Sequence, residues 1–433
     1  MFPRDSHDMT FDIAPRYSAE GTSQLWLVTG VALAASLAMV VVGFEHQSLV
    51  ANAGDPYGYG QIARGLVEHG FDKVTRRAAM LYPHLLAAIY WSGGTDSVAL
   101  MFHCLFHAGT SMLVFVIGRR LYNVRTGLLA GLFTAVNPML LRYAADLHTE
   151  TMLVFLTTLT VWCAIRFYHA PTVANGVFLG FVGMLATLTK GIVLPIVVAF
   201  VAVWLLRTLR REGLSVRAVA SALAVAVTMG VVVAPWTYRN YRVSGRFVLL
   251  TPGTADAFLR GYVFTRLEFA TLQQPPYTVA ENESNEWFRR IAKEAGTTWE
   301  LDEIVDEANN SRVMKQMIRE HPLDTARKFV VGLFTFWYEM TSFRNSLVPA
   351  VLALALWVLT FLGLKRARAE RRPSWLVLVP IVVVNVVVAL LIPLGRYSVP
   401  ILPCLAVLAA FGVDTLVARR SMDAAARHAS MRA

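Results

Sequence analysis

The most constraining feature of the sequence is an uncharged apolar run at 25–43, which is followed by further runs of the same kind. Runs of about 18 or more apolar residues with few charges can cross a bilayer as helices. Residues 1–24 are too mixed for the charged start of a signal peptide, so we expect the first run to be retained. The sequence therefore predicts an all-α polytopic membrane protein with about ten transmembrane helices, at 25–43, 98–117, 126–141, 149–167, 173–189, 192–206, 218–236, 346–364, 375–393 and 398–417.

The overall composition agrees with this fold class. Hydrophobic residues make up 56% of the chain and charged residues 16%, and the mean hydropathy is +0.50. Soluble domains are closer to half apolar and a quarter charged. The net charge of +11 does not indicate nucleic acid as a partner, because Lys and Arg gather in the cytoplasmic loops of membrane proteins. Cys104, Cys163 and Cys404 lie in separate apolar stretches, and their spacing predicts neither a zinc site nor a disulfide framework.

Arginine-rich loops predict the orientation of the chain. With the ten spans above, four basic clusters fall on one side of the membrane, which we predict to be the cytoplasmic side of a bacterial inner membrane. Both termini then lie in the cytoplasm. The four clusters are at 119–125, 207–217, 365–372 and 419–420.

Two long segments are predicted on the outer side. The first, 44–94, contains a short apolar stretch at 80–91 that we expect to pack at the membrane surface. The second, 238–327, is polar and reads as helical from 281 to 320, which predicts a small outer cap. The stretch 328–340 is amphipathic and rich in aromatic residues, as in a helix lying in the membrane plane. The predicted units are an N-terminal membrane domain (1–236), an outer cap with the in-plane helix (237–345) and C-terminal membrane helices with a cytoplasmic tail (346–433).

Acidic side chains occur at two places near the outer surface. Asp55 could act as a general base or bind a metal ion, or it could cap the helix that starts at the following proline. The segment DLHTET supplies Asp146, His148 and Glu150 at the outer start of the fourth span. On a helix, Asp146 and Glu150 would share a face with His148 turned away. These acids could hold a cation or orient an acceptor, or they could match the helix dipole.

Basic side chains occur later in the chain at the same surface. Lys190 lies between two apolar runs, where it could snorkel to the interface or contact an anionic headgroup. Arg239 follows a span and suits either a phosphate or an interface anchor. Arg396 and Tyr397 occupy a short turn between two spans, which keeps the arginine close to the membrane surface. Acids from early loops and bases from later ones suit a reaction between a lipid-phosphate donor and an acceptor activated by a carboxylate.

The order of these motifs resembles the glycosyltransferase C superfamily, specifically its branch of bacterial protein O-mannosyltransferases and aminoarabinose lipid A transferases. The resemblance covers most of the chain. It rests on GDPYGYGQIARGLVEHG, LYPHLLAAIY, GRRLYNVRTGLLAGLFTAVNPMLLRYAADLHTET, APWTYRNYRVSGRFVLLTPGTADAFLRGY, HPLDTARKF and GRYSVPILPCLAVLAAFG. It implies an outer-face transfer of a sugar from a polyprenyl-phosphate donor to a lipid, glycan or protein acceptor.

The resemblance also implies roles for the residues above. It makes Asp55 the catalytic base or a metal-site residue and adds Asp146 and Glu150 as the second acidic motif. Lys190 and Arg396 become contacts of the donor phosphate. We add Arg239 and Tyr397 to these phosphate contacts, Tyr59, Tyr82 and Trp91 as rings that stack on sugars, and Asp55 with His148 as ligands of a divalent metal ion.

Two points stay open at this stage. Many relatives carry an Asp-Glu pair in the first outer loop, whereas here Pro56 follows Asp55, so the need for a metal ion is not decided. The alternative function is a flippase or transporter for lipid-linked saccharides. Transporters usually carry ionisable groups near the bilayer midplane and related halves, and the sequence has neither pattern. We therefore favour the transferase.

Overall fold

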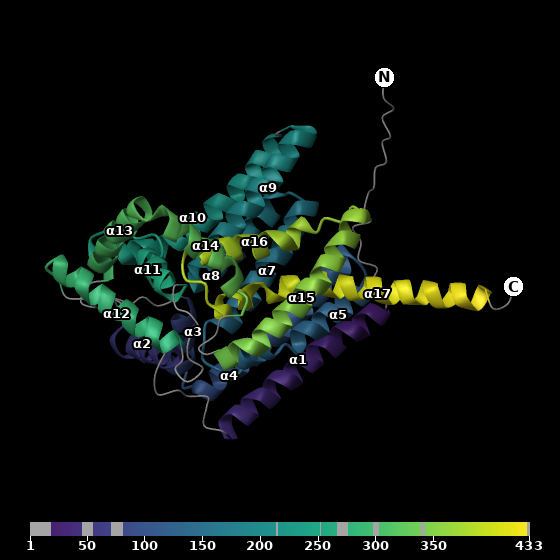
Figure 1. The fold of residues 1–433 in the computed structure, drawn as a ribbon, viewed down its shortest axis with the longest axis horizontal. Helices are drawn as coiled ribbons and strands as arrows, with labels where there is room; N and C mark the ends of the chain where they lie inside the picture. The colour runs from purple at the N-terminus through teal and green to yellow at the C-terminus, as the bar shows by residue number, and fades with distance from the viewer. Residues whose placement is uncertain are drawn as a thin grey trace.

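The chain folds entirely into helices in its described part. The computed structural model describes residues 19–45, 55–70, 81–213, 215–251, 253–265, 276–297, 303–338 and 343–430. Every regular element within these ranges is a helix, and no strand occurs among them (Figure 1). The predicted all-α fold class is therefore confirmed.

Several helices are long and apolar enough to cross a membrane, which makes the chain a multi-pass membrane protein. Seven meet this criterion, or eight if one bent pair counts as a span, whereas α8 (Val173–Thr189) and α16 (Trp375–Leu390) are shorter apolar helices. The predicted count of ten is not confirmed, although each predicted range falls on an apolar helix. The seven are α1 (Ala19–Glu45), α4 (Asp96–Leu121), α7 (Glu150–His169), α9 (Leu194–Glu212) preceded by η1 (Gly191–Val193), α10 (Val216–Ser244), α15 (Phe343–Ala369) and α17 (Leu402–Ser430) preceded by η2 (Gly395–Ile401).

The predicted span at 126–141 is a broken helix. It consists of α5 (Val124–Ala135) and α6 (Pro138–Ala144), which are bent by 53° relative to each other. The side chain of Asn137 accepts hydrogen bonds from two N–H groups in the first turn of α6, and Pro138 occupies the position where a helix needs no N–H. Because α6 starts with its own cap at Asn137, the helix of α5 does not continue into it. The predicted span at 126–141 is therefore one span only if this bent pair crosses the membrane together.

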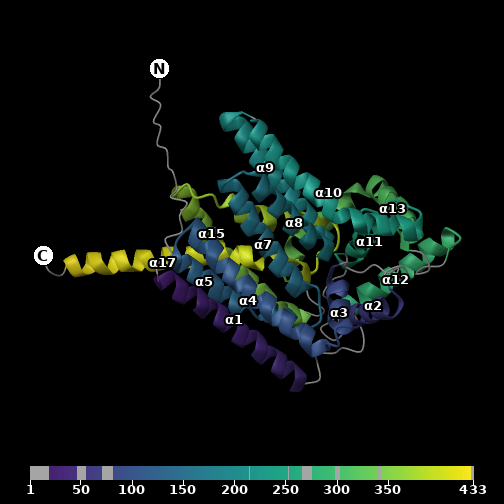
Figure 2. The same ribbon diagram turned by 180° about the vertical axis from the view of Figure 1, so that it is seen from behind.

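Six further helices belong to the segments predicted outside the membrane. Five of them, α2, α3, α11, α12 and α13, gather at one end of the bundle, which we call the cap end (Figures 1 and 2). The short apolar stretch at 80–91 forms α3, and the helical stretch predicted at 281–320 forms two helices. The division into three units and the in-plane position of α14 stay predictions. The six are α2 (Asp55–His69), α3 (Leu81–Trp91), α11 (Thr254–Phe264), α12 (Pro276–Glu294), α13 (Glu303–Glu320) and α14 (Pro322–Thr335).

Burial divides the spans into central and peripheral helices. In the span Gly395–Val417, which joins η2 and α17, 83% of the most apolar window is buried, and in α7 the share is 72%. The corresponding share in α15 is only 17%, and in α1 it is 22%. Apolar side chains that stay exposed on long helices suit contact with lipid. The helices that carry Glu150, Arg396 and Tyr397 therefore lie at the centre of the bundle.

Glycines allow α15 and α17 to pack against each other at very short range. A Cβ atom at Gly363 would overlap the carbonyl oxygen of Leu408, and one at Gly412 would overlap that of Leu359. Small residues at such positions let two membrane helices approach until their backbones touch. This contact fixes α15 on the central helix α17.

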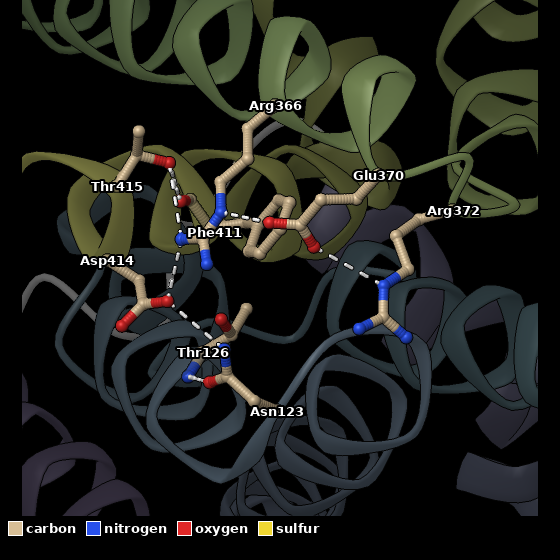
Figure 3. Close-up of polar contacts among 8 residues, drawn as sticks. All are labelled: Asn123, Thr126, Arg366, Glu370, Arg372, Phe411, Asp414 and Thr415. Atoms are coloured by element: carbon tan, nitrogen blue, oxygen red, sulfur yellow. Dashed lines mark hydrogen bonds and ion pairs between the residues drawn. The ribbon is translucent and has the colours of Figure 1, made fainter. Parts of the chain in front are cut away.

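The end of the bundle opposite the cap end carries arginine-rich turns, and we call it the arginine-rich end. There Arg366 at the end of α15 donates to Glu370 at 2.6 Å and to Asp414 of α17 at 2.9 Å (Figure 3). The side chain of Asn123, in the turn between α4 and α5, donates to the same Asp414 oxygen at 3.1 Å. Arg372 lies 3.4 Å from Glu370.

These five residues, Asn123, Arg366, Glu370, Arg372 and Asp414, form what we call the inner clamp. It joins the end of α15, the middle of α17 and the turn between α4 and α5. Asn123 also caps α5, and the guanidinium of Arg366 lies 4.4 Å from the ring centroid of Phe411. Two of the predicted basic loops, 119–125 and 365–372, thus meet at one end of the bundle, although their position on the cytoplasmic side stays a prediction.

Candidate active site

A buried ion pair joins two residues from separate parts of the predicted site. Glu150 begins α7 and is only 2% exposed, and its Oε1 lies 3.0 Å from Nζ of Lys190. Lys190 has extended backbone geometry at the break between α8 and η1, so its backbone belongs to neither helix. An acid in the first turn of α7 also matches the positive end of the helix dipole. The other carboxylate oxygen of Glu150 accepts a hydrogen bond from the Thr149 hydroxyl at 3.1 Å.

The turn that follows α16 brings two more predicted residues to this pair. Nζ of Lys190 lies 4.3 Å from the ring centroid of Tyr397, and the guanidinium of Arg396 lies 5.0 Å from it. Nη2 of Arg396 also donates to the Tyr397 hydroxyl at 3.1 Å. We call Glu150, Lys190, Arg396 and Tyr397 the Lys190 group. The structure therefore brings together Glu150 and Arg396, which are more than 240 positions apart and belong to separate motifs of the sequence.

The charges of the Lys190 group do not cancel. It holds two cations, Lys190 and Arg396, and one carboxylate, Glu150, which attracts both of them. Both oxygens of that carboxylate have hydrogen-bond donors, so Glu150 is suited to fixing the lysine and not to taking a proton. The surplus positive charge lies beside the partly buried ring of Tyr397, where opposite charge is attracted more strongly than in water. An anion such as a phosphate fits this arrangement.

The second acidic motif differs from its predicted geometry. Asp146 lies in the turn between α6 and α7, because α7 begins only at Glu150. The prediction that Asp146 and Glu150 share a helix face with His148 turned away is therefore wrong. His148 instead pairs with Asp146, with 3.0 Å between Nδ1 and Oδ2, and its ring stands edge-on to Tyr143. The other oxygen of Asp146, Oδ1, is buried without a hydrogen-bond partner among the described residues.

The three aromatic residues proposed to stack on sugars occupy different environments. Tyr82 is fully buried, and its hydroxyl lies 3.0 Å from Nε2 of His103, so its ring has no open face in this structure. Burial also raises the pKa of Tyr82 well above its usual value. Tyr59 of α2 packs edge-on against Tyr82 and is partly exposed, whereas Trp91 at the end of α3 is 80% exposed. Tyr59 and Trp91 therefore keep surface that a sugar could contact.

Asp55 is the first residue of α2, as expected for an Asp-Pro helix start, but its side chain lies outside the described residues. Its role as base and its pairing with His148 around a metal ion both stay predictions. Within the described residues, no group of three or more His, Cys, Asp and Glu side chains is arranged to hold a metal ion. Asp146 and His148 alone supply too few ligands for a closed site.

Arg239 lies in a neighbouring group near the end of α10. Its guanidinium is 4.8 Å from the ring centroid of Trp236 and its Nη1 donates to Asn240 at 3.4 Å. Trp236 donates from Nε1 to the carbonyl oxygen of Leu250, whose side chain packs near Gly191, the residue after Lys190. A chain of contacts through Trp236 and Leu250 thus leads from Arg239 to the residue that follows Lys190.

Sequence reasoning missed several residues that shape the site. Thr149, Tyr143 and His103 contact Glu150, His148 and Tyr82 respectively. A threonine before a helix and a histidine within an apolar run are common in helical proteins, so neither marks a functional site. Only the proximity of Thr149 and Tyr143 to DLHTET offered a signal.

Lys328 of α14 is a further buried cation that the sequence did not single out. It is 3% exposed, its Nζ donates to the carbonyl oxygen of Leu390 at 2.5 Å, and it lies 4.3 Å from the ring centroid of Phe258. Burial lowers its pKa from 10.5 to about 7. Because Leu390 ends α16 just before η2, Lys328 connects α14 and α11 to the segment that leads to Arg396.

A family model agrees with part of this site. The family described as dolichyl-phosphate-mannose-protein mannosyltransferase matches residues 79–238. This range is less than half of the chain and contains Asp146, Glu150 and Lys190 but neither Asp55 nor Arg396. No match was found among curated protein sequences.

Solved structures share the fold over nearly the whole chain. The archaeal oligosaccharyltransferase AglB from Archaeoglobus fulgidus, in complex with an inhibitory peptide and a dolichol-phosphate, aligns with 95% of this chain at a TM-score of 0.56 and 11% identity. An apo structure of an oligosaccharyltransferase from the same organism aligns with 94% of the chain at a TM-score of 0.57 and 13% identity. The partial family match and this shared fold agree with the resemblance noted in the sequence.

The solved structures that share this fold are longer than this chain. The chain spans 52% of each of these two oligosaccharyltransferase chains. ArnT from Cupriavidus metallidurans, bound to undecaprenyl phosphate, aligns with 90% of this chain and 77% of its own at 17% identity, with a TM-score of only 0.42. At these identities the likeness establishes the fold, and the reaction has to be argued from the site.

Proposed function

We propose that the protein is a membrane glycosyltransferase that moves a sugar from a polyprenyl-phosphate donor to an acceptor. The observation that carries this proposal is the Lys190 group, in which two cations and one carboxylate meet at the centre of the bundle. A phosphate bound there would neutralise the surplus charge of Lys190 and Arg396. The dolichol-phosphate in the AglB structure and the mannosyltransferase family match support the choice of a lipid-phosphate donor.

The reaction would be an inverting displacement. The oxygen of an acceptor hydroxyl forms a bond to the anomeric carbon while the bond from that carbon to the phosphate oxygen breaks. The bonding electrons leave with the polyprenyl phosphate, and the hydroxyl proton passes to the carboxylate of Asp55. Lys190, Arg396 and the nearby Arg239 stabilise the negative charge that grows on the departing phosphate.

The other residues would orient the reactants. Glu150 holds Lys190 in place through their ion pair, and Tyr397 keeps Arg396 beside it. The buried oxygen of Asp146 that lacks a partner among the described residues is free to accept a hydrogen bond from a substrate hydroxyl. Tyr59 and Trp91 would offer ring surface to the sugar or the acceptor.

The setting follows from the orientation proposed above. We place the cap end on the outer face of a bacterial inner membrane, with both termini in the cytoplasm. The cap at 237–345 would then contact the acceptor. Any divalent metal ion would depend on Asp55 with His148, and the reaction above does not require it.

Transfer from labelled polyprenyl-phosphate sugars by the purified, reconstituted chain tests this proposal. The wild type is compared with Asp55→Asn and Arg396→Gln, and Arg210→Gln serves as the control because Arg210 is an exposed arginine in the last turn of α9, away from the cap. We expect transfer by the wild type and the control, and a loss of about a hundredfold in each of the other two.

Three results would contradict the proposal. Full transfer by Asp55→Asn would show that Asp55 is not the base. Full transfer by Arg396→Gln would show that the donor phosphate does not bind at the Lys190 group. If no variant forms a new glycosidic bond but the labelled donor crosses the vesicle membrane intact, the protein is a transporter.

A further inference from the structure

A continuous row of arginine and aromatic side chains crosses the arginine-rich end of the bundle. The guanidinium of Arg207 lies 5.4 Å from the ring centroid of Trp375, and Trp375 stands edge-on to Tyr168 at 5.3 Å. Tyr168 in turn contacts His169 at 5.2 Å between ring centroids. The row thus passes from α9 through the start of α16 to the end of α7.

Two more arginines extend the row to α4. Arg120 is close enough to both Arg166 and His169 for their charges to interact, and Arg120 and Arg166 are both exposed. The guanidinium of Arg166 also lies 4.8 Å from the ring centroid of Trp162. We call Arg120, Arg166, Tyr168, His169, Arg207 and Trp375 the arginine–aromatic band.

The chain supplies very little negative charge to this band. The sequence has no Asp or Glu from 97 to 145 or from 151 to 211. The next acid, Glu212, has a side chain outside the described residues. Glu370 and Asp414 lie at the same end of the bundle, but both are engaged in the inner clamp by Arg366.

The band also contains hydrogen-bond donors that lack acceptors. Neither Nε of Arg207 nor Nε1 of Trp375 has a hydrogen-bond partner among the described residues. Among the described side chains, none with a carboxylate pairs with Arg120 or Arg166 to offset their repulsion. Both observations point to an anion that the described part of the protein does not provide.

Position in the membrane identifies the kind of anion. The band lies at the ends of spanning helices, and aromatic rings at such ends sit at the level of lipid headgroups. Arginine presents paired donors that match phosphate geometry. We propose that the arginine–aromatic band binds the phosphate of an anionic phospholipid from the leaflet at this end of the bundle.

Lipid retained by the purified full-length chain tests this site. The wild type, the double variant Arg120→Gln/Arg166→Gln and a control, Arg210→Gln/Arg217→Gln, are reconstituted with phosphatidylcholine and phosphatidylglycerol and then extracted in detergent. The control removes two exposed arginines from α9 and α10 and therefore changes the net charge equally. Lipid bound per protein is counted by mass spectrometry, and size-exclusion chromatography verifies folding.

We expect the band variant to retain about tenfold less phosphatidylglycerol than the wild type and the control to lose no more than about twofold, since paired contacts add to diffuse attraction. Equal losses in both variants would overturn the proposal, because general attraction to positive charge would then explain the binding. Equal retention of phosphatidylcholine and phosphatidylglycerol by the wild type would also overturn it.

A second measurement uses the wild type alone and separates a lipid from a free anion. The midpoint of thermal unfolding is measured in detergent with phosphatidylglycerol, phosphatidylcholine or inorganic phosphate at equal concentration. We expect phosphatidylglycerol to raise the midpoint by several degrees more than the other two. An equal rise with inorganic phosphate would overturn the assignment to a lipid.

Discussion

Lys190–Glu150 and Arg366–Asp414 join a cation to a carboxylate at nearly the same distance, 3.0 and 2.9 Å, at opposite ends of the bundle. Their surroundings differ. In the inner clamp, Arg366 and Arg372 meet two carboxylates, and the amide of Asn123 completes the hydrogen bonds. In the Lys190 group two cations, Lys190 and Arg396, both interact with the same carboxylate, Glu150. An ion pair with balanced neighbours connects helices, whereas one with surplus charge is suited to a ligand.

The strongest test of this contrast is Lys190→Met. The change removes one of the two cations and leaves Glu150 buried without its ion-pair partner. We expect sugar transfer to fall by about 10²–10³-fold, measured as initial rates at equal amounts of folded protein. Lys190→Arg keeps the charge and should recover part of the rate. Transfer by Lys190→Met above about a tenth of the wild-type rate would place the phosphate elsewhere.

The opposite result is expected in the inner clamp. Arg366→Met leaves Asp414 and Glu370 without their main donor, so we expect the free energy of unfolding to fall by about 1–3 kcal/mol. Transfer per folded molecule should stay near the wild-type rate. Thermal unfolding and the transfer assay measure the two effects, and the exposed Arg368→Met on the same helix is the control. A large loss of transfer with unchanged stability would contradict the distinction between the two pairs.

Lys328 is a buried cation that pairs with no carboxylate among the described residues, and it tests the effect of burial alone. Its pKa is lowered to about 7, so between that value and 10.5 the unfolded chain holds a proton that the folded protein has released. Stability contributed by this group therefore rises with pH in that window, by at most about 1.4 kcal/mol per pH unit. The difference in unfolding midpoint between the wild type and Lys328→Met should grow from pH 7 to pH 9 in favour of the wild type. A constant difference would show that the ammonium is solvated.

The smallest effect is expected from Tyr82→Phe. It removes the hydroxyl that faces His103, and the loss of one buried hydrogen bond costs about 0.5–1.5 kcal/mol. Because the ring has no open face, transfer should be nearly unchanged. The exposed Tyr241→Phe is the control for thermal unfolding. A rise in KM for the donor without a loss of stability would instead mean that Tyr82 contacts the sugar.

The sequence predicted the apolar helices and the residues of the Lys190 group because both leave local signals. Apolar runs mark α1, α7 and α17, and a lysine or arginine at a span boundary stands out against its neighbours. The bend at Asn137 was missed although a proline follows it, because the run stays apolar across the break. The predicted positions of Asp146 and His148 on a helix were wrong because no glycine or proline in the sequence marks the turn before α7.

Burial of single side chains could not be predicted in the same way. Lys328 lies on an amphipathic helix with charged neighbours, and only the tertiary contacts with Phe258 and Leu390 bury its ammonium. Tyr82 resembles any ring near the membrane surface until His103 of another helix meets its hydroxyl. The burial of Lys328 and of Tyr82 depends on residues that are distant in the sequence. The pattern of residues along one segment cannot show such contacts.

One straight segment links the two regions compared above. Arg396 stands in η2 and Asp414 lies on α17, so at about 1.5 Å per residue their backbones are separated by roughly 27 Å along the helix axis. This length is close to the hydrocarbon thickness of a bilayer, about 30 Å. Because the inner clamp fixes one end of the segment, the depth of Arg396 in the membrane is set by helix length. We therefore expect the proposed sugar transfer to depend on lipid acyl chain length, since a thicker or thinner bilayer would change how a donor phosphate meets this arginine.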